Sequence, residues 1–296
     1  MSFVRCPAAI MLMCTFRPTR ERRLEHDRRG GEGERAAAGT RGGGASGRRP
    51  ASHDAVTGPD DSTADLSPFP PPDTIEGVLF DFHSTLVDQG DAASWIRLAW
   101  QHAGRQGDPV TVLGGERAAR LATWAERIWE NVRKIDPHSR RDLDPESHRK
   151  VYDRLVRTAP DVDAELAQAL YATLLETWIP YDDALPVLSA LRTRGIRTAL
   201  VSNIGIDVRH VLKRSGLANL LDAVVVSYEA GAVKPDAAIF THALELLRVP
   251  AQRALMVGDN WRDDGGAAAL GIRTLLLPRT SGASHGLDLV LRLVGD

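Results

Sequence analysis

Cysteine is almost absent from this 296-residue chain, because both cysteines, Cys6 and Cys14, lie within the first 14 residues. The rest of the chain can form neither a disulfide framework nor a thiolate metal site, so a reducing, cytoplasmic location is expected. An excess of charge is also missing, since the formal net charge is -2. Nucleic acid and anionic lipid are therefore not expected as partners, and a small-molecule substrate is expected instead.

Long apolar runs are missing as well. The apolar stretch at residues 8–16 is too short to span a bilayer and makes a poor secretory signal, so no membrane association is expected. Residues 17–73 are rich in Arg, Gly and Pro and have almost no periodic apolar positions. Such a segment cannot bury enough apolar area to offset its ordering entropy, which predicts a disordered tail over residues 1–74.

Five short apolar runs after the tail have the pattern of fully buried strands. They occupy residues 78–82, 197–202, 223–227, 254–258 and 274–277. Helical patterns follow the later runs, at residues 184–194, 208–214, 237–247 and 263–270. Strands that alternate with helices predict an α/β fold, a doubly wound parallel sheet of Rossmann-like type with helices on both faces.

The interval between the first and second runs exceeds a hundred residues, far more than a crossover connection needs. Its own patterns are helical, at residues 92–103, 116–135, 145–158 and 163–177. We therefore expect an α-helical cap at residues 90–181, inserted into a core made of residues 75–89 and 182–296.

Polar residues that could take part in catalysis or binding follow the ends of four of these runs. They are Asp81 and His83, Ser202 and Asn203, Lys234, and the acids Asp259, Asp263 and Asp264. In open parallel sheets, ligands bind beyond the carboxyl ends of the strands. The four groups are thus expected to meet in one site.

In order and spacing, these groups resemble the motifs of the haloacid dehalogenase-like superfamily. The matching segments are Asp81-Phe82-His83-Ser84-Thr85, Val201-Ser202-Asn203, Val233-Lys234-Pro235-Asp236 and Val257-Gly258-Asp259. The first motif departs from the family pattern, Asp-x-Asp-x-Thr, because His83 stands where a second aspartate is usual.

The resemblance implies a Mg²⁺-dependent phosphatase in which Asp81 is the nucleophile and forms an aspartyl-phosphate. It also implies that Asp81, Asp259 and the backbone carbonyl of His83 hold the metal, which prefers oxygen ligands. Ser202, Asn203 and Lys234 would then bind the phosphoryl oxygens, where donors and a cation are needed.

Two further assignments concern proton transfer and the acidic motif. The resemblance implies that the residue at position 83 acts as general acid and then as general base, and His83 could do both, since an unperturbed imidazole has a pKa of about 6.5. Asp263 and Asp264 compete for one role beside the metal. The resemblance favours Asp263 for this role among the catalytic residues, since the family's shorter acidic motif places its second acid four residues after the first, and Asp264 would then lie in the first turn of a helix.

Two alternatives remain open. The first is a metal-independent 2-haloacid dehalogenase-like hydrolase, in which Asp81 displaces halide from carbon; such enzymes also have a helical cap and lack the second aspartate. The second is a non-catalytic binding protein that retains the fold. No subset of the cap's polar residues singles out a substrate, and no pattern indicates an oligomeric state.

Overall fold

Strand β2 (Gly77–Phe80) lies inside a six-stranded sheet with the order β1-β8-β7-β2-β5-β6. The computed structural model describes residues 11–13, 74–280 and 282–295 of the chain. The remaining strands of this sheet are β1 (Met11–Met13), β5 (Arg197–Ser202), β6 (Ala223–Val226), β7 (Ala254–Gly258) and β8 (Arg273–Leu276). Strands β2, β5, β6, β7 and β8 are parallel, whereas β1 runs antiparallel to β8.

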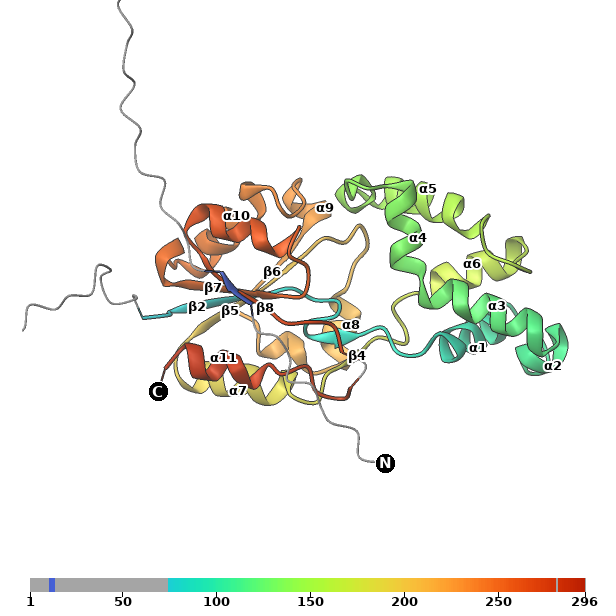
Figure 1. Ribbon diagram of the computed structural model, residues 1–296, viewed down its shortest axis with the longest axis horizontal. Helices are drawn as coiled ribbons and strands as arrows, with labels where there is room; N and C mark the ends of the chain where they lie inside the picture. The colour runs from blue at the N-terminus through green and yellow to red at the C-terminus, as the bar shows by residue number, and fades with distance from the viewer. Residues whose placement is uncertain (1–10, 14–73, 281, 296) are drawn as a thin grey trace, which may run out of the picture. The chain divides into compact units, whose positions relative to one another are not determined.

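Successive residues of β2 pack on opposite faces of the sheet. Val78 and Phe80 belong to one apolar cluster, and Leu79 belongs to another. Helices α7 (Ala184–Thr193) and α11 (Asp288–Leu293) cover the first face, and α10 (Ala237–Leu247) covers the second (Figure 1). Burial on both faces explains why the strand is apolar at consecutive positions.

The predicted doubly wound α/β fold is confirmed, and its five strands occur within two residues of their expected bounds. The segment predicted as a helix at residues 263–270 is instead a 3₁₀ helix, η4 (Asp264–Leu270). Most of the predicted disordered tail, residues 1–10 and 14–73, lies outside the described residues. Within that tail, residues 11–13 form the unexpected strand β1.

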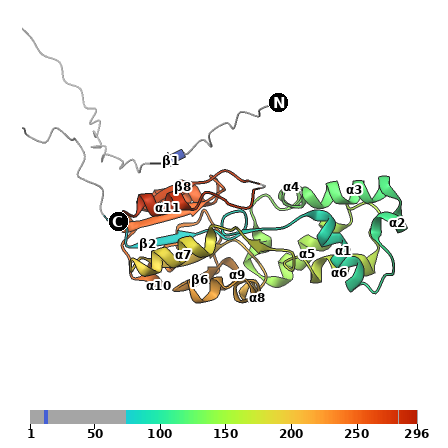
Figure 2. The same ribbon diagram turned by 90° about the horizontal axis from the view of Figure 1, so that it is seen from below.

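The segment expected to form the cap, residues 90–181, is largely helical, as predicted, although the single helix expected at residues 116–135 is two helices. Its helices are α1 (Ala92–His102), α2 (Pro109–Leu113), α3 (Gly115–Glu126), α4 (Ile128–Ile135), α5 (Pro145–Val156) and α6 (Ala164–Ala172). Four of them begin after an aspartate whose side chain accepts a backbone N–H of the first turn, as Asp91 does from Ser94. These helices lie together in both views (Figures 1 and 2).

A two-stranded ladder joins the entry to this helical segment and the exit from it. Strand β3 (Val87–Asp88) pairs antiparallel with β4 (Ile179–Pro180). The boundaries expected at residues 90 and 181 lie within two residues of this ladder. These boundaries remain predictions, because residues 73–296, which include both cap and core, belong to one compact unit.

Two short helices complete the core. They are α8 (Arg209–Arg214), which follows β5, and α9 (Ser227–Ala230), which follows β6. Helix α9 directly precedes the loop that carries Lys234, and it contacts the cap segment at residues 140–143. The core therefore touches the cap close to the ends of its strands.

Candidate active site

One pocket collects the side chains that follow the strands. Asp81 still belongs to the sheet ladder, because its backbone N–H donates to the carbonyl of Val257 at 2.9 Å. The pocket is lined from the core by Asp81, His83, Ser202, Asn203, Lys234, Asp259, Asn260, Asp263, Asp264 and Arg279. Every residue singled out from the sequence is thus brought to the same place, as expected for strands whose carboxyl ends share one edge.

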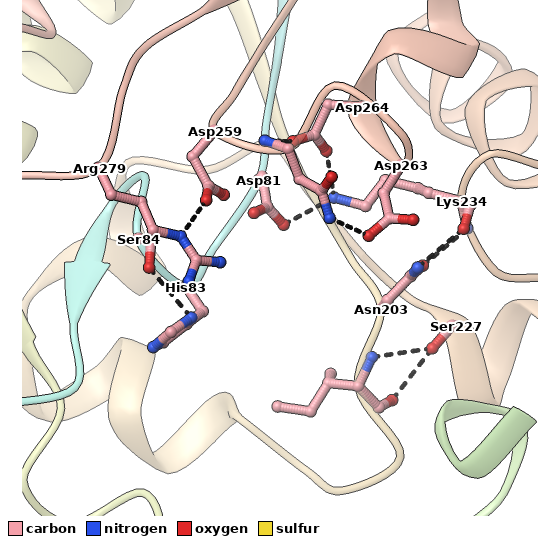
Figure 3. Close-up of polar contacts among 12 residues, drawn as sticks. Asp81, His83, Ser84, Asn203, Ser227, Lys234, Asp259, Asp263, Asp264 and Arg279 are labelled. Atoms are coloured by element: carbon pink, nitrogen blue, oxygen red, sulfur yellow. Dashed lines mark hydrogen bonds and ion pairs between the residues drawn. The ribbon is translucent and has the colours of Figure 1, made fainter. Parts of the chain in front are cut away.

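Lys234 is the centre of the core side of the pocket (Figure 3). Its Nζ lies 2.6 Å from Oδ1 of Asp81 and 2.7 Å from Oδ1 of Asp264, and the side chain is only 2% exposed. Burial alone lowers the pKa of Lys234, but attraction to Asp264 and Asp81 outweighs it, and the pKa rises above its usual value. The lysine therefore remains a cation directly beside the candidate nucleophile.

Asn203 positions Lys234. Its Nδ2 donates to the carbonyl of Lys234 at 2.9 Å, and the backbone N–H of Lys234 donates to its Oδ1 at 2.7 Å. Both ends of the amide are therefore used on the lysine backbone. Asn203 and the buried Ser202 both line the pocket, but Asn203 acts there through Lys234.

Asp264, and not Asp263, contacts Lys234 and lies in the acidic cluster, which differs from the preference for Asp263 expected from the sequence. Asp264 is fully buried between Lys234 and the backbone N–H of Asn260, which donates to its Oδ2 at 2.9 Å. An added Cβ at Gly258 would lie 2.1 Å from that oxygen. Asp263 is half-buried on the pocket wall and accepts a hydrogen bond from the side chain of Asn260.

Asp259 is paired with Arg279, a residue that the sequence did not single out. Arg279 Nε lies 2.5 Å from Oδ2 of Asp259. Burial, together with the neighbouring Asp81, raises the pKa of Asp259 to about 6 against the opposing effect of Arg279. Because Arg279 follows β8, the fifth strand end also contributes to the site.

The acidic groups fit a hard divalent cation. Ligand oxygens of Asp81, Asp259 and Asp264 all lie within 4.8 Å of one another. Carboxylate oxygens at such spacing are the donors that Mg²⁺ uses, together with water and substrate oxygens. Since Lys234 and Asn260 already occupy Asp264, the carboxylates of Asp81 and Asp259 are the better ligands. The expected ligation by the backbone carbonyl of His83 remains a prediction.

His83 lies in an aromatic wall of the pocket. Its ring centroid is 4.9 Å from that of Trp129 and 4.8 Å from that of Trp178, and its Nδ1 lies 3.2 Å from Ser84 Oγ. Burial lowers the pKa of His83 to about 4, and Arg279 acts in the same direction. This differs from the unperturbed value assumed from the sequence and favours a neutral imidazole.

The cap closes the pocket with residues that the sequence did not rank. They are Trp129, Arg133, Ser139, Arg141, Asp142, His148, Leu174, Leu175 and Trp178. Among them, Arg141 and Asp142 are buried and lie 3.0 Å apart from Nη2 to Oδ2. A helical pattern shows which cap residues share a face, but not which face meets the core, so no sequence signal could have selected these positions.

A buried serine links cap and core beside this pocket. Ser227 Oγ donates to the carbonyl of Asp142 at 2.5 Å and accepts the backbone N–H of Ile204 at 2.9 Å. At the adjacent Gly205, an added Cβ would lie 2.5 Å from the carbonyl oxygen of Arg141 and 2.8 Å from Cβ of His148. The absence of a side chain at Gly205 thus lets the cap backbone approach the core.

Comparison with known proteins shows the family to which the chain belongs. Residues 75–271 match the profile of a family described as haloacid dehalogenase-like hydrolase. A haloacid dehalogenase-like hydrolase domain-containing protein 3 from Danio rerio is 30% identical over 227 residues, which cover 73% of this chain and 90% of that protein. The chain therefore belongs to the haloacid dehalogenase-like hydrolase family and is a hydrolase.

Two further similar proteins are a relative in sequence and a solved structure. A glyceraldehyde 3-phosphate phosphatase from Methanopyrus kandleri is 31% identical over 212 residues, covering 69% of this chain and 84% of that protein. The crystal structure of a dehalogenase with an intermediate complex matches with a TM-score of 0.55 at 22% identity, covering 76% of this chain and 99% of that one. The latter likeness concerns the fold alone. Among the described residues, no helix is long and apolar enough to cross a membrane.

Proposed function

We propose that this chain is a Mg²⁺-dependent phosphomonoester hydrolase that acts on a small phosphorylated metabolite. The observation that carries the proposal is the cluster in which Lys234 lies between Asp81 and Asp264 while Asp259 stands within 4.8 Å of both acids. A cation beside a carboxylate nucleophile, with further carboxylates for a metal, is what attack on an anionic phosphoryl group requires.

In the proposed reaction, the Asp81 carboxylate attacks phosphorus, the bond between phosphorus and the ester oxygen breaks, and the departing alkoxide takes a proton from solvent water to leave as the alcohol. Water then attacks phosphorus of the aspartyl-phosphate, releases inorganic phosphate and restores the carboxylate. Lys234 holds the nucleophile and stabilises charge on the phosphoryl oxygens, and the Ser202 hydroxyl supplies a further donor. A bound Mg²⁺ at Asp81 and Asp259 would neutralise charge on the same oxygens.

His83 is the proposed proton carrier. Its imidazole lines the same pocket as Asp81, and a neutral ring accepts a proton from water. The ring is held by Ser84 and by the two tryptophans, so its orientation is fixed before the substrate enters. Because Asp264 is the acid that contacts Lys234, Asp263 is proposed as a polar residue of the pocket wall and not as a catalytic residue.

Carbon–halogen hydrolysis is the second candidate. Two observations favour it: Arg279 already neutralises Asp259, and aromatic rings line the pocket beside Asp81. In that reaction Asp81 would attack carbon and displace halide, and no cation would be needed to approach the nucleophile. Asp259, a second buried acid beside the nucleophile, has no role in such chemistry, which is why phosphate ester hydrolysis is preferred.

One experiment separates the two candidates. The full-length protein is assayed against a panel of phosphorylated metabolites and 2-haloacids, each with Mg²⁺ and with EDTA. Phosphate release that requires Mg²⁺ supports the phosphatase, whereas halide release that persists in EDTA supports the dehalogenase. A cytoplasmic location, which the scarcity of cysteine favours, and a small-molecule substrate, which the pocket between cap and core suits, complete the proposal.

A further inference from the structure

The basic side chains of the pocket are not all paired with carboxylates. Four basic side chains line it: Arg133, Arg141, Lys234 and Arg279. Lys234 is held by two aspartates, and Arg279 is held by Asp259. The buried Arg141 lies 3.3 Å from Asp136 and 3.0 Å from Asp142. Three of the four positive charges are therefore balanced within the protein.

Arg133 is the fourth. It stands in the last turn of α4, its residue is exposed, and among the described residues no carboxylate lies within 4.0 Å of its guanidinium. Its charge nevertheless acts in the pocket. Burial raises the pKa of Asp263, and Lys234 and Arg133 both oppose that rise across the cavity. Arg133 thus offers an unbalanced charge to whatever fills the space between cap and core.

The surface between Arg133 and the catalytic cluster is aromatic. Trp129 precedes Arg133 by four residues on α4, which places the two side chains one turn apart on the same helix face. The Trp129 ring lies against His83 and Trp178, and its Nε1 donates to Gln89 at 2.5 Å. A bound molecule would therefore meet the lysine cluster at one end, aromatic rings along its body and Arg133 at the other end.

We propose that Arg133 binds a second anionic group of the substrate, so that the enzyme prefers phosphate monoesters that also carry a carboxylate or a second phosphate. This deepens the proposed function and rests on it. A guanidinium binds a carboxylate or a phosphate through two parallel hydrogen bonds, which gives direction as well as attraction. The small cavity, about 90 Å³, suits a short carbon chain between the two anionic ends.

The test compares substrates that share a three-carbon skeleton. Glycerol 3-phosphate has one anionic group, 3-phosphoglycerate adds a carboxylate, and glycerol 1,3-bisphosphate adds a phosphate. We expect Arg133→Met to lower kcat/KM for the two doubly anionic esters by roughly 10- to 100-fold, mainly through KM. The loss for glycerol 3-phosphate should stay below about 3-fold, since it makes no such contact. Whichever doubly anionic ester loses more identifies the preferred second group.

Two control variants make the result specific. Arg133→Lys keeps the charge but cannot form two parallel hydrogen bonds, so it should recover only part of the preference. Lys134→Met removes a neighbouring charge that donates a hydrogen bond to Asn131 and does not line the pocket. It should leave kcat/KM unchanged for all three substrates. An equal loss by Arg133→Met on all three substrates, or no loss on any, would overturn the proposal.

A binding measurement keeps this proposal separate from the proposed function. Calorimetry is carried out with 3-phosphonopropionate and propylphosphonate, two compounds that cannot be hydrolysed. Both have a three-carbon skeleton and a phosphonate, and only the first carries a carboxylate. Tighter binding of 3-phosphonopropionate that disappears in Arg133→Met supports the subsite even if no monoester is hydrolysed. Mg²⁺-dependent hydrolysis without any effect of Arg133 would retain the phosphatase and reject the subsite.

Discussion

Arg279 covers Asp259 from the solvent side. The two side chains meet at 2.5 Å, yet Asp259 is only 3% exposed while Arg279 is 47% exposed. A half-exposed arginine therefore neutralises a buried acid at the place where a divalent cation is expected. The two cations would compete for one carboxylate, which leads to a prediction about metal affinity.

Replacing Arg279 should tighten Mg²⁺ binding. Arg279→Met removes the competing cation, so the dissociation constant for Mg²⁺ should fall by roughly 3- to 10-fold in calorimetry. The melting temperature without metal should fall, because Asp259 is left unpaired. Arg262→Met is the matched control, since Arg262 stacks on the exposed Trp261 and does not line the pocket. Weaker Mg²⁺ binding in Arg279→Met would show that the arginine supports the metal instead.

Asp81→Asn should fold but lose turnover by at least about 10³-fold, because an amide is a poor nucleophile and a poor metal ligand. The side chain keeps its shape, and Lys234 keeps Asp264 as its partner. Steady-state assays and thermal melting are measured on the same preparation. A folded Asp81→Asn protein with near-normal turnover would refute the assignment of the nucleophile.

The two neighbouring acids should behave differently. Asp264→Ala removes a fully buried carboxylate from a buried lysine, a change that typically costs about 3–5 kcal/mol of unfolding free energy. Asp263→Ala removes a half-buried group whose partner is the Asn260 side chain and should cost about 1 kcal/mol or less. Chemical denaturation of both variants gives the comparison. Equal losses would argue against the positions described for the two residues.

Gly205 should control how closely the cap approaches the core. In Gly205→Ala the new Cβ meets the carbonyl of Arg141 at 2.5 Å, so the cap segment has to shift. Because this segment carries pocket residues, KM should rise more than kcat falls. Gly265→Ala is the control, since its Cβ meets nothing within 4 Å. Unchanged kinetics in Gly205→Ala would mean that the cap adapts without consequence for the pocket.

His148 should make the folded state less stable in mild acid. Burial, assisted by Arg141, lowers the pKa of this histidine from 6.5 to about 4. Below pH 6.5 the unfolded chain therefore takes up a proton that the folded protein refuses, and stability falls until about pH 4. His148→Gln retains a polar partner for Tyr171 and should lose less stability over this range. Parallel denaturation curves for both proteins across the window would contradict the prediction.

The sequence predicted the sheet and most of its catalytic edge because both depend on local patterns. A strand buried on two faces must be apolar at successive positions, as at Val78 and Leu79, and the parallel order then places Asp81 and Lys234 together. The choice between Asp263 and Asp264 depends on the path of a loop, which spacing does not specify. The structure explains the glycine at 258, where an added Cβ would lie 2.1 Å from Oδ2 of Asp264, but a single glycine does not reveal that contact in the sequence.

The cap side of the pocket was not predictable in the same way. Trp129 and Arg133 follow ordinary helical spacing, and nothing local distinguishes a face that meets the core from one that meets solvent. Arg279 stands in a loop after β8, where an isolated arginine carries no pattern. The contribution of each depends on contacts between segments far apart in the chain.

The pairing of β2 has a consequence for how the protein is made. Gly77 of this strand pairs with Arg197 on one side and Ala254 on the other. During synthesis, β2 therefore leaves the ribosome long before either neighbour exists, and the whole cap is translated in between. Its backbone edges remain without partners and its apolar faces remain uncovered throughout that interval, which makes the nascent chain prone to aggregation and a target for chaperones. The insertion that shapes the pocket thus also delays completion of the sheet.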